Sequence, residues 1–215
     1  MFTTDRDLLI LEPNLFRDVL WLSQRRVTGT GVISSGAVMF TTSDNRLSTA
    51  GVGPGSVVVV GATPYEVMEV TSDTDAVISL IRASASGDIV PPGDSPTDTT
   101  ATISTFVPQI GIVQSQVLRM LGIEPGQATT PGHPGEDAIT NPGSLTRFIA
   151  LGALHLIYSS AGVLTPADSP LNQRADLYRL RFSRERERVT IGIDLNNDGL
   201  PDATRKLNMI QFVRS

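Results

Sequence analysis

The hydrophobic positions of the chain change periodicity near residue 27 and again near residue 105. Between these points, short runs rich in β-branched residues alternate with turn-forming segments such as SDN, GPG and SDTD. The runs are GAVMFTT, SVVVVGA, PYEVMEV, AVISLIR and TATISTF. Four or five short strands at this spacing predict a small sheet or barrel. Residues 84–100 are polar and rich in proline, which is typical of a linker or an extended arm.

Helical periodicity precedes this β-rich region. The segment LLILEP predicts a helix capped by Thr4 or Asp5, and Pro13 then either kinks it or opens a further turn. Apolar residues continue a helical face as far as Gln24. The stretch VLWLSQRRV is also compatible with the start of a strand, so two interpretations remain open there.

Helical periodicity returns at Phe106. The segment FVPQIGIVQSQVLRMLGI carries one apolar stripe, made of Ile110, Val113, Val117, Leu118 and Leu121. A second apolar helix is expected over residues 145–161, capped by Ser144 and ended by Gly162. Between these helices, residues 124–143 predict a long loop that is functional or becomes ordered on a partner.

A last helix is expected from Pro170 onward, with Leu177, Leu180, Phe182 and Tyr178 on its apolar face. Arginine and glutamate crowd its other side. The arginines are Arg174, Arg179, Arg181, Arg184, Arg186 and Arg188. Such a run is typical of a solvated face, and the alternative is a surface that faces a partner or DNA.

Residues 189–215 contain two runs of alternating apolar and polar residues, RVTIGID and TRKLNMIQFVRS, separated by DLNNDGLPD. Alternation at period two predicts half-buried strands, and the Asn-Asp-Gly cluster predicts a hairpin turn. The second run continues to the last residue. An uncovered strand edge favours pairing with another sheet, so this segment is a candidate docking arm.

These patterns predict an α+β fold of three parts. A small helical bundle is formed by residues 1–26 and 106–188. A β-rich insertion, a small sheet or barrel with a proline-rich linker, occupies residues 27–105. A C-terminal β-hairpin or docking arm follows over residues 189–215.

Composition limits the classes of function. The net charge of −5 disfavours a protein that grips nucleic acid phosphates, because that task needs a basic face. The absence of cysteine excludes disulfides and thiolate metal sites. The start MFTTDRDLLI lacks the pattern of a signal peptide. Residues 148–164 are apolar, but His155 in their middle favours a buried helix over a membrane span.

The segment between the two C-terminal strands resembles the first part of a calcium loop. Asp194, Asn196, Asp198 and Asp202 occupy ligand positions one, three, five and nine, and Gly199 occupies position six. Position twelve, which needs a bidentate carboxylate, is Arg205. The favoured interpretation is therefore a hairpin loop stabilised by Asx turns, with calcium binding through those four residues as the alternative.

The sequence predicts no catalytic site. His133 lies in the segment PGHPG, and His155 lies within the most apolar helix, where a hydrogen-bonded core residue is more common than a catalytic base. The motifs G-x-S-x-G and H-E-x-x-H do not occur. The glycines of AGVGPGSVVVVG precede a strand and lack the GK[ST] of a phosphate-binding loop, so they predict a turn.

The layout resembles the head-to-tail adaptor (connector or neck) proteins of tailed bacteriophages. The resemblance rests on the early helix, the insertion over residues 27–105, the helix ending LRMLGI and the segment LTRFIALGALHLIYSSAG. It extends to RADLYRLRFSRERERVTIGIDLNNDGLPDATRKL, which is similar to the last helix pair and C-terminal hairpin of the family. It covers most of the chain and contains no invariant catalytic motif.

The resemblance implies a structural virion protein of the neck, assembled in the host cytoplasm. Its expected partners are the portal protein, neighbouring copies in a closed ring that is commonly a dodecamer, and a downstream neck or tail protein. Genomic DNA would pass through the channel without sequence-specific binding, and no membrane contact, enzymatic activity or required cofactor is expected. The residues expected to bind the portal are Arg205, Leu207, Met209, Gln211, Phe212, Val213 and Arg214.

Two other classes remain as alternatives. One is a calcium-binding interaction module that uses the DLNNDGLPD loop. The other is a small enzyme, which would need a pocket of carboxylates with shifted pKa values near His155.

Overall fold

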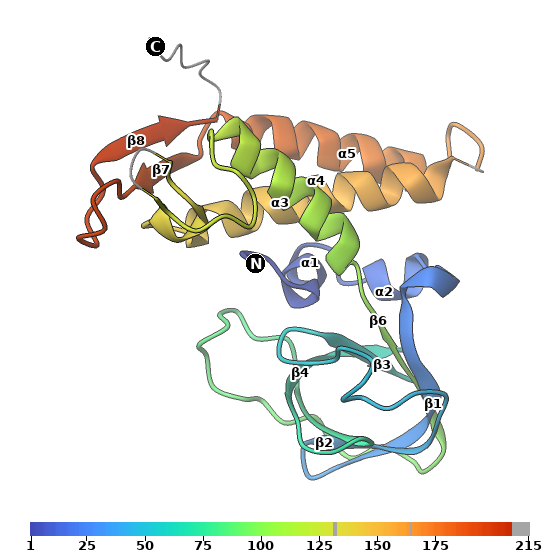
Figure 1. Ribbon diagram of the computed structural model, residues 1–215. Helices are drawn as coiled ribbons and strands as arrows, with labels where there is room; N and C mark the ends of the chain where they lie inside the picture. The colour runs from blue at the N-terminus through green and yellow to red at the C-terminus, as the bar shows by residue number, and fades with distance from the viewer. Residues whose placement is uncertain (131–132, 164, 208–215) are drawn as a thin grey trace. The chain divides into compact units, whose positions relative to one another are not determined.

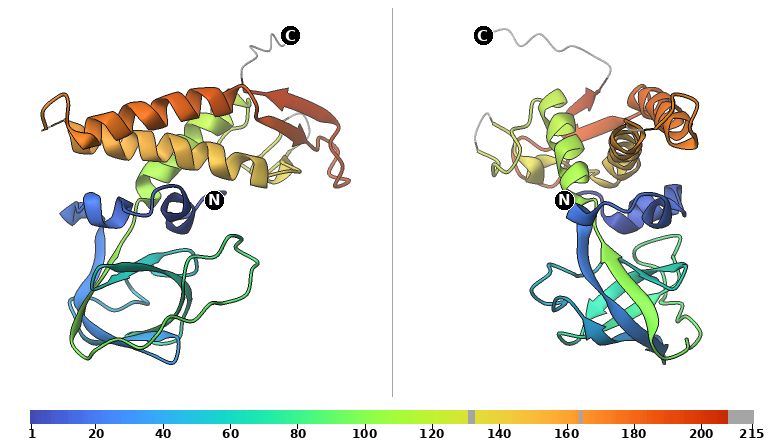
Figure 2. Two further views of the ribbon diagram at one scale, coloured as in Figure 1. Left: turned by 180° about the vertical axis from the view of Figure 1, so that it is seen from behind. Right: turned by 90° about the vertical axis from the view of Figure 1, so that its right-hand side faces the viewer.

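A computed structural model describes residues 1–130, 133–163 and 165–207. The chain contains both helices and strands and divides into two compact units (Figures 1 and 2). The barrel unit comprises Thr4–Val107, and the bundle unit comprises Met1–Thr3 together with the chain from Pro108 onward. The expected α+β class is confirmed.

Six antiparallel strands close into a barrel in the order β1-β2-β5-β4-β3-β6. Figure 1 shows this barrel. The strands are β1 (Arg25–Ser34), β2 (Ala37–Ser43), β3 (Val57–Val60), β4 (Thr63–Val70), β5 (Asp75–Ser79) and β6 (Thr99–Ser104). Strands β2 to β6 coincide with the five predicted runs. Their inward residues, among them Val38, Val58 and Ile78, are fully buried in the barrel core.

Strand β1 has no counterpart among the five predicted runs, but it begins at Arg25 within VLWLSQRRV, where the start of a strand was one of the two interpretations. Gly29 and Gly31 interrupt its apolar alternation, although both are required by the close approach of β2. A Cβ atom at Gly29 would lie 1.8 Å from the carbonyl oxygen of Thr42. The ladder between β1 and β2 also changes register between Thr30 and Gly31, and a bulge of this kind breaks the period of two.

Two short helices replace the helical face predicted to reach Gln24. Helix α1 spans Asp5–Leu11 with Thr4 as its N-cap, helix α2 spans Leu15–Asp18, and the 3₁₀ turn η1 spans Leu22–Gln24. All three belong to the barrel unit, whereas the sequence grouped residues 1–26 with the bundle.

Contacts with the barrel explain the grouping of α1. The carboxylate of buried Asp5 accepts a hydrogen bond from the Phe106 N–H at 2.7 Å. Burial raises the pKa of Asp5 to about 6, against the opposing effects of Thr105, Phe106 and Arg26.

A buried ionic cluster also joins α1 to the barrel. Glu66 on β4 is 2% exposed and accepts two hydrogen bonds from Arg82, at 2.7 and 3.1 Å. The Nε atom of Arg6 lies 3.0 Å from the same carboxylate. Arg6 also donates to the Arg82 carbonyl oxygen at 2.6 Å. One carboxylate therefore holds two guanidinium groups inside the barrel unit.

The proline-rich segment over residues 84–100 packs against the barrel, although its composition predicts a free linker. Pro92 is buried, and the Ser95 N–H donates to the Ile33 carbonyl oxygen at 3.0 Å. Ser95 Oγ accepts from the Ile33 N–H at 2.8 Å. Backbone and hydroxyl groups bind this segment, so its lack of apolar residues does not prevent packing.

The described part of the bundle unit contains three α-helices and a hairpin. They are α3 (Val107–Met120), which begins at the unit boundary, α4 (Gly143–Gly162), α5 (Pro170–Arg186), β7 (Thr190–Ile193) and β8 (Ala203–Lys206). All five residues of the stripe predicted on α3 are buried. Helix α4 begins one residue before Ser144, whose side chain forms no cap, so that predicted cap is wrong. No helix in the described part of the chain has the length and hydropathy needed to cross a membrane.

Helices α4 and α5 lie side by side in both figures and pack through aromatic rings. Phe148 stacks on Phe182 with ring centroids 4.4 Å apart, and Tyr158 stacks on Tyr178 at 5.8 Å. Gly152 permits this approach, because a Cβ atom there would lie 2.8 Å from the Phe182 ring.

The predicted apolar face of α5 is therefore only partly right. Ala175 and Tyr178 are buried, but Leu177 is 42% and Leu180 is 49% exposed. Tyr178 and Phe182 lie one helical turn apart and define the face that meets α4. Leu177 and Leu180 lie off this face along the same helix, which agrees with their exposure.

The sequence predicts residues 124–143 to be a long loop that is functional or becomes ordered on a partner. Their described part contains the 3₁₀ turn η2 (Glu136–Ala138), and Glu136 accepts hydrogen bonds from Gln114 and from the Gly126 N–H. Asp137 accepts from the Thr129 hydroxyl, which lowers the pKa of that carboxyl. Acidic side chains inside the loop thus organise it.

Candidate functional site

The predicted C-terminal hairpin forms, with β7 and β8 antiparallel: Thr190 pairs with Lys206 and Ile193 with Ala203. Strand β8 ends at Lys206, and the predicted continuation over residues 208–215 lies outside the described residues. Its loop is organised around Asp194, which is 6% exposed. The two carboxylate oxygens accept hydrogen bonds from the N–H groups of Asn196, Asn197 and Gly199 at 3.2, 2.6 and 2.7 Å. Burial opposes ionisation of Asp194, but the backbone donors outweigh it and hold the pKa of that carboxyl below its usual value.

The other proposed calcium ligands also bind groups within the loop. Asp202 accepts from the Leu195 N–H at 2.7 Å and from the Asn196 side-chain amide at 3.2 Å. Asp198 accepts from the Leu200 N–H at 2.8 Å. Among the described residues, no group of three or more His, Asp or Glu side chains is placed to hold a metal ion. The arrangement is that of successive Asx turns, and calcium binding remains a prediction.

Two of the residues expected to bind the portal lie in the described part of the chain. The Arg205 guanidinium donates to the carbonyl oxygen of Leu121, at the end of α3. Leu207 is only 3% exposed, and its carbonyl oxygen accepts from Arg186 Nε at 3.0 Å. These two residues thus attach the hairpin to α3 and α5. The remaining predicted residues, Met209, Gln211, Phe212, Val213 and Arg214, lie outside the described residues.

Four of the six arginines of α5 and the turn that follows it have intramolecular contacts. Arg174 donates to the Tyr158 hydroxyl at 3.0 Å, and the Arg181 guanidinium lies 5.6 Å from the Tyr178 ring centroid. Arg179 pairs with Asp176 at 3.3 Å, and Arg186 binds Leu207 as described above. The arginine run is therefore partly structural and is not simply a solvated face.

The histidines occupy separate places. His155 Nδ1 lies 3.1 Å from both the Ala175 carbonyl oxygen and the Ser159 hydroxyl, inside the α4–α5 packing. His133 is exposed, and its backbone pairs with Thr130. The environment of His155 matches the expected hydrogen-bonded core residue.

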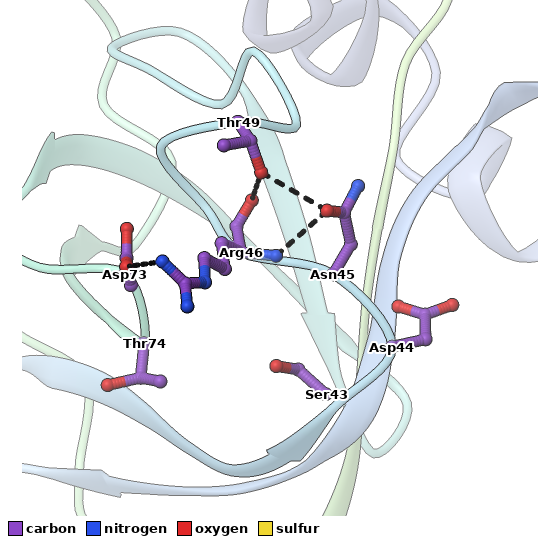
Figure 3. Close-up of a pocket in the computed structure, with 7 residues that line it drawn as sticks. All are labelled: Ser43, Asp44, Asn45, Arg46, Thr49, Asp73 and Thr74. Atoms are coloured by element: carbon purple, nitrogen blue, oxygen red, sulfur yellow. Dashed lines mark hydrogen bonds and ion pairs between the residues drawn. The ribbon is translucent and has the colours of Figure 1, made fainter.

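A polar hollow of about 750 Å³ lies on the barrel unit, and Figure 3 shows its lining. Arg46 pairs with Asp73 at 3.2 Å, and Asn45 accepts hydrogen bonds from the Arg46 N–H and from Thr49. Asp44 accepts from the Thr28 N–H at 2.7 Å. These side chains hold the loop after β2 in place, which is a structural role.

A second, smaller pocket of about 280 Å³ was not predicted from the sequence. It lies on the outside of the barrel, where the segment from Phe16 to Arg25 crosses β3 and β6. Trp21 lines it and packs edge-on against buried Phe106, with centroids 5.9 Å apart. The signal available in the sequence was the apolar triplet LWL between Arg17 and Arg25, in a stretch where a helix and the start of a strand both remained open.

Comparison of the chain with protein-family models, curated proteins and solved structures finds no match. Function is therefore inferred from the chain's own surfaces. Three of them stand out in the described residues: the exposed leucines of α5, the C-terminal hairpin and the pocket beside Trp21.

Proposed function

We propose that the protein is a structural virion component, a head-to-tail adaptor that forms a ring below the portal and extends the DNA conduit. The observation that carries the proposal is the exposed face of α5. Leu177 and Leu180 are 42% and 49% exposed on a helix whose opposite face packs on α4. Adjacent exposed leucines on a rigid helix suit a surface that neighbouring subunits cover.

The ring geometry gives this face a role. In a closed cyclic ring, each copy uses two different faces, one for each neighbour. The leucines of α5 and the arginines beside them form one candidate face. Stacked rings hold one side of α5 against α4, so the side chains on its outer side have fixed positions. A contact that is repeated around a ring requires such fixed positions.

The remaining partners follow from the same role. The hairpin, attached through Arg205 and Leu207, would lead the following residues toward the portal. A downstream neck or tail protein would dock on the ring. The net charge of −5 suits a conduit through which DNA passes without sequence-specific binding. The protein would be located in the virion neck after assembly in the host cytoplasm.

Sedimentation velocity with the portal ring from the same genome tests the docking role. Full-length protein and a truncation ending at Leu207 are compared, because this end point keeps the contacts of Arg205 and Leu207. We expect the full-length chain to co-sediment and the truncated chain to remain free. If neither form binds the portal, the adaptor role is contradicted. Binding by both forms would contradict only the docking arm.

A double variant, Leu177→Glu with Leu180→Glu, tests the ring face. We expect the double variant to bind the portal as isolated copies and not as a full ring, because two carboxylates would be buried in the contact between neighbouring subunits. Mass photometry of the complex counts the copies. Met39→Glu is the matched control, since Met39 is 47% exposed but lies on β2 of the barrel unit. Equal copy numbers for the double variant and the control would argue against this face.

The calcium-binding module is the second candidate, supported by the spacing of Asp194, Asn196, Asp198 and Asp202. Thermal unfolding with calcium and with chelator separates the two proposals. An adaptor whose loop is held by its own N–H groups shows the same melting temperature in both conditions. A melting temperature that rises with calcium, and no longer does so in Asp194→Asn, would instead support the calcium module.

A further inference from the structure

The pocket beside Trp21 combines apolar walls with a basic rim. Phe16, Leu20, Trp21 and Val59 provide apolar surface, and Trp21 is held in place by its edge-on contact with Phe106. Arg17 and Arg25, both exposed, line the same pocket. Hydroxyl groups come from Thr100, Thr102 and Ser104 on β6. None of the lining residues is acidic.

The charge of the barrel unit makes this basic rim unusual. Residues 4–107 contain six arginines and no lysine, against twelve Asp and Glu residues. Arg6 and Arg82 are buried on Glu66, and Arg46 pairs with Asp73. Of the other three arginines, Arg17 and Arg25 line the pocket, and the charge of Arg26 acts on buried Asp5. Two of the six arginines of an acidic unit thus lie at one pocket.

Apolar surface continues beyond the pocket. Leu20 is 65% exposed, and Leu22, which follows Trp21, is 77% exposed. These are large exposed fractions for leucines that flank a concave site, and they extend the contact area past the pocket. A ligand that covers them must be longer than a single side chain. A polypeptide segment meets this requirement, with one side chain inserted and its neighbours lying across the leucines.

We propose that this pocket binds an acidic peptide segment of a partner protein. An aromatic or aliphatic side chain of the segment would insert against Trp21, and its flanking carboxylates would pair with Arg17 and Arg25. Nucleic acid is disfavoured, because the unit carries twelve acidic residues against six arginines and its net negative charge repels a chain of phosphates. The inference is independent of the adaptor role, since it rests on the barrel unit alone.

Trp21 provides a direct measurement, because it is the one tryptophan of the chain and lines the site. The full chain is titrated with the acetylated, amidated peptide Glu-Asp-Phe-Asp-Glu while tryptophan emission is followed. The comparison ligands are the uncharged peptide Gln-Asn-Phe-Asn-Gln and oligothymidylate. We expect a saturable change with the acidic peptide that weakens as salt is added, and no saturable change with the other two.

Two variants and one control connect the signal to the pocket. We expect Arg17→Gln together with Arg25→Gln to weaken acidic-peptide binding by about tenfold or more, because two charge-assisted contacts are lost. Arg46→Gln, which removes an exposed arginine outside the pocket, should bind as the unchanged protein does. Both variants change exposed side chains, and their circular dichroism confirms that they fold.

Three outcomes would overturn the proposal. The first is the absence of a saturable response to the acidic peptide. The second is equal binding by the double variant and the unchanged protein. The third is tighter binding of oligothymidylate than of the acidic peptide, which would make the pocket a nucleic acid site.

Discussion

Helix α1 is joined to the barrel by buried charged side chains, whereas α4 and α5 of the bundle unit are joined by stacked rings. In the barrel unit, Arg6, Glu66 and Arg82 form a buried cluster in which the carboxylate is 2% exposed. In the bundle unit, Arg147 and Glu185 form a pair at 3.7 Å whose arginine is 60% exposed, while stacked rings join the helices. The contact between α1 and the barrel thus depends on a buried ionic cluster, and the contact between α4 and α5 depends on steric fit.

The largest expected effect comes from breaking the buried cluster. Glu66→Gln leaves two guanidinium groups without their shared carboxylate, and we expect the free energy of unfolding to fall by about 3–5 kcal/mol. Denaturant unfolding followed by Trp21 fluorescence reports on the barrel unit. Glu69→Gln, on the exposed side of the same strand, is the control. A loss similar to that of the control would show that the cluster is dispensable.

The buried carboxyl of Asp5 should make the barrel unit lose stability as pH rises. Its pKa is raised to about 6 in the folded state, from 3.8, so the folded state holds the proton more tightly than the unfolded chain. This contribution is fully present below pH 4 and is lost as pH rises through 6. Asp5→Asn removes the cost of ionisation and can still accept from Phe106.

The measurement for Asp5 is the difference in unfolding free energy between variant and unchanged protein at several pH values. We expect Asp5→Asn to gain about 2–3 kcal/mol relative to the unchanged protein between pH 4 and pH 7. Subtracting the two curves removes the titration of all other groups. A difference curve that is flat over this range would contradict the raised pKa.

Steric fit between α4 and α5 is tested at Gly152. Gly152→Val places a side chain within 2.8 Å of Phe182 and within 2.7 Å of Val113, and we expect a loss of about 1–3 kcal/mol. Far-UV circular dichroism follows the unfolding, since most helical residues lie in the bundle unit. Gly111→Ala on α3, where no atom lies within 4 Å of the added Cβ, should be neutral or stabilising. Similar losses in both variants would contradict the packing explanation.

The smallest effect is expected at the exposed pair. Arg147→Gln removes a contact at 3.7 Å from a largely solvated guanidinium, so we expect a change of about 0.5 kcal/mol or less. The same denaturant experiment measures it. A loss as large as that of Glu66→Gln would remove the contrast between the two units.

Strands were predictable from the sequence where runs of β-branched residues lie between turn-forming segments. A strand whose position depends on close backbone contacts was not predictable. Strands β2 to β6 follow the apolar runs. Strand β1 depends on Gly29 and Gly31, because a Cβ atom at either position would clash with the backbone of β2. On α5, Leu177 and Leu180 satisfy helical periodicity as well as Tyr178 and Phe182 do. The choice between them depends on the rings of α4, which a single helix does not reveal.

The candidate sites also differ in whether local sequence or contacts between distant segments determine them. The hairpin and its loop were predicted from local turn chemistry, because Asp194 binds N–H groups within five residues of itself. The pocket beside Trp21 brings together residues from three separate segments. No spacing in the sequence connects Arg17 with Val59 or Thr102. Sites made by tertiary neighbours therefore required the structure.

The order of the units along the chain has a consequence for biosynthesis. The barrel unit is one continuous segment, whereas the bundle unit begins with three residues and resumes at Pro108. The Phe2 N–H donates to Gln114, and the Thr3 hydroxyl donates to the Thr146 carbonyl oxygen, 112 and 143 residues further along. On the ribosome, the barrel can therefore fold before its neighbour is synthesised. The first three residues stay unpaired until α3 and α4 emerge.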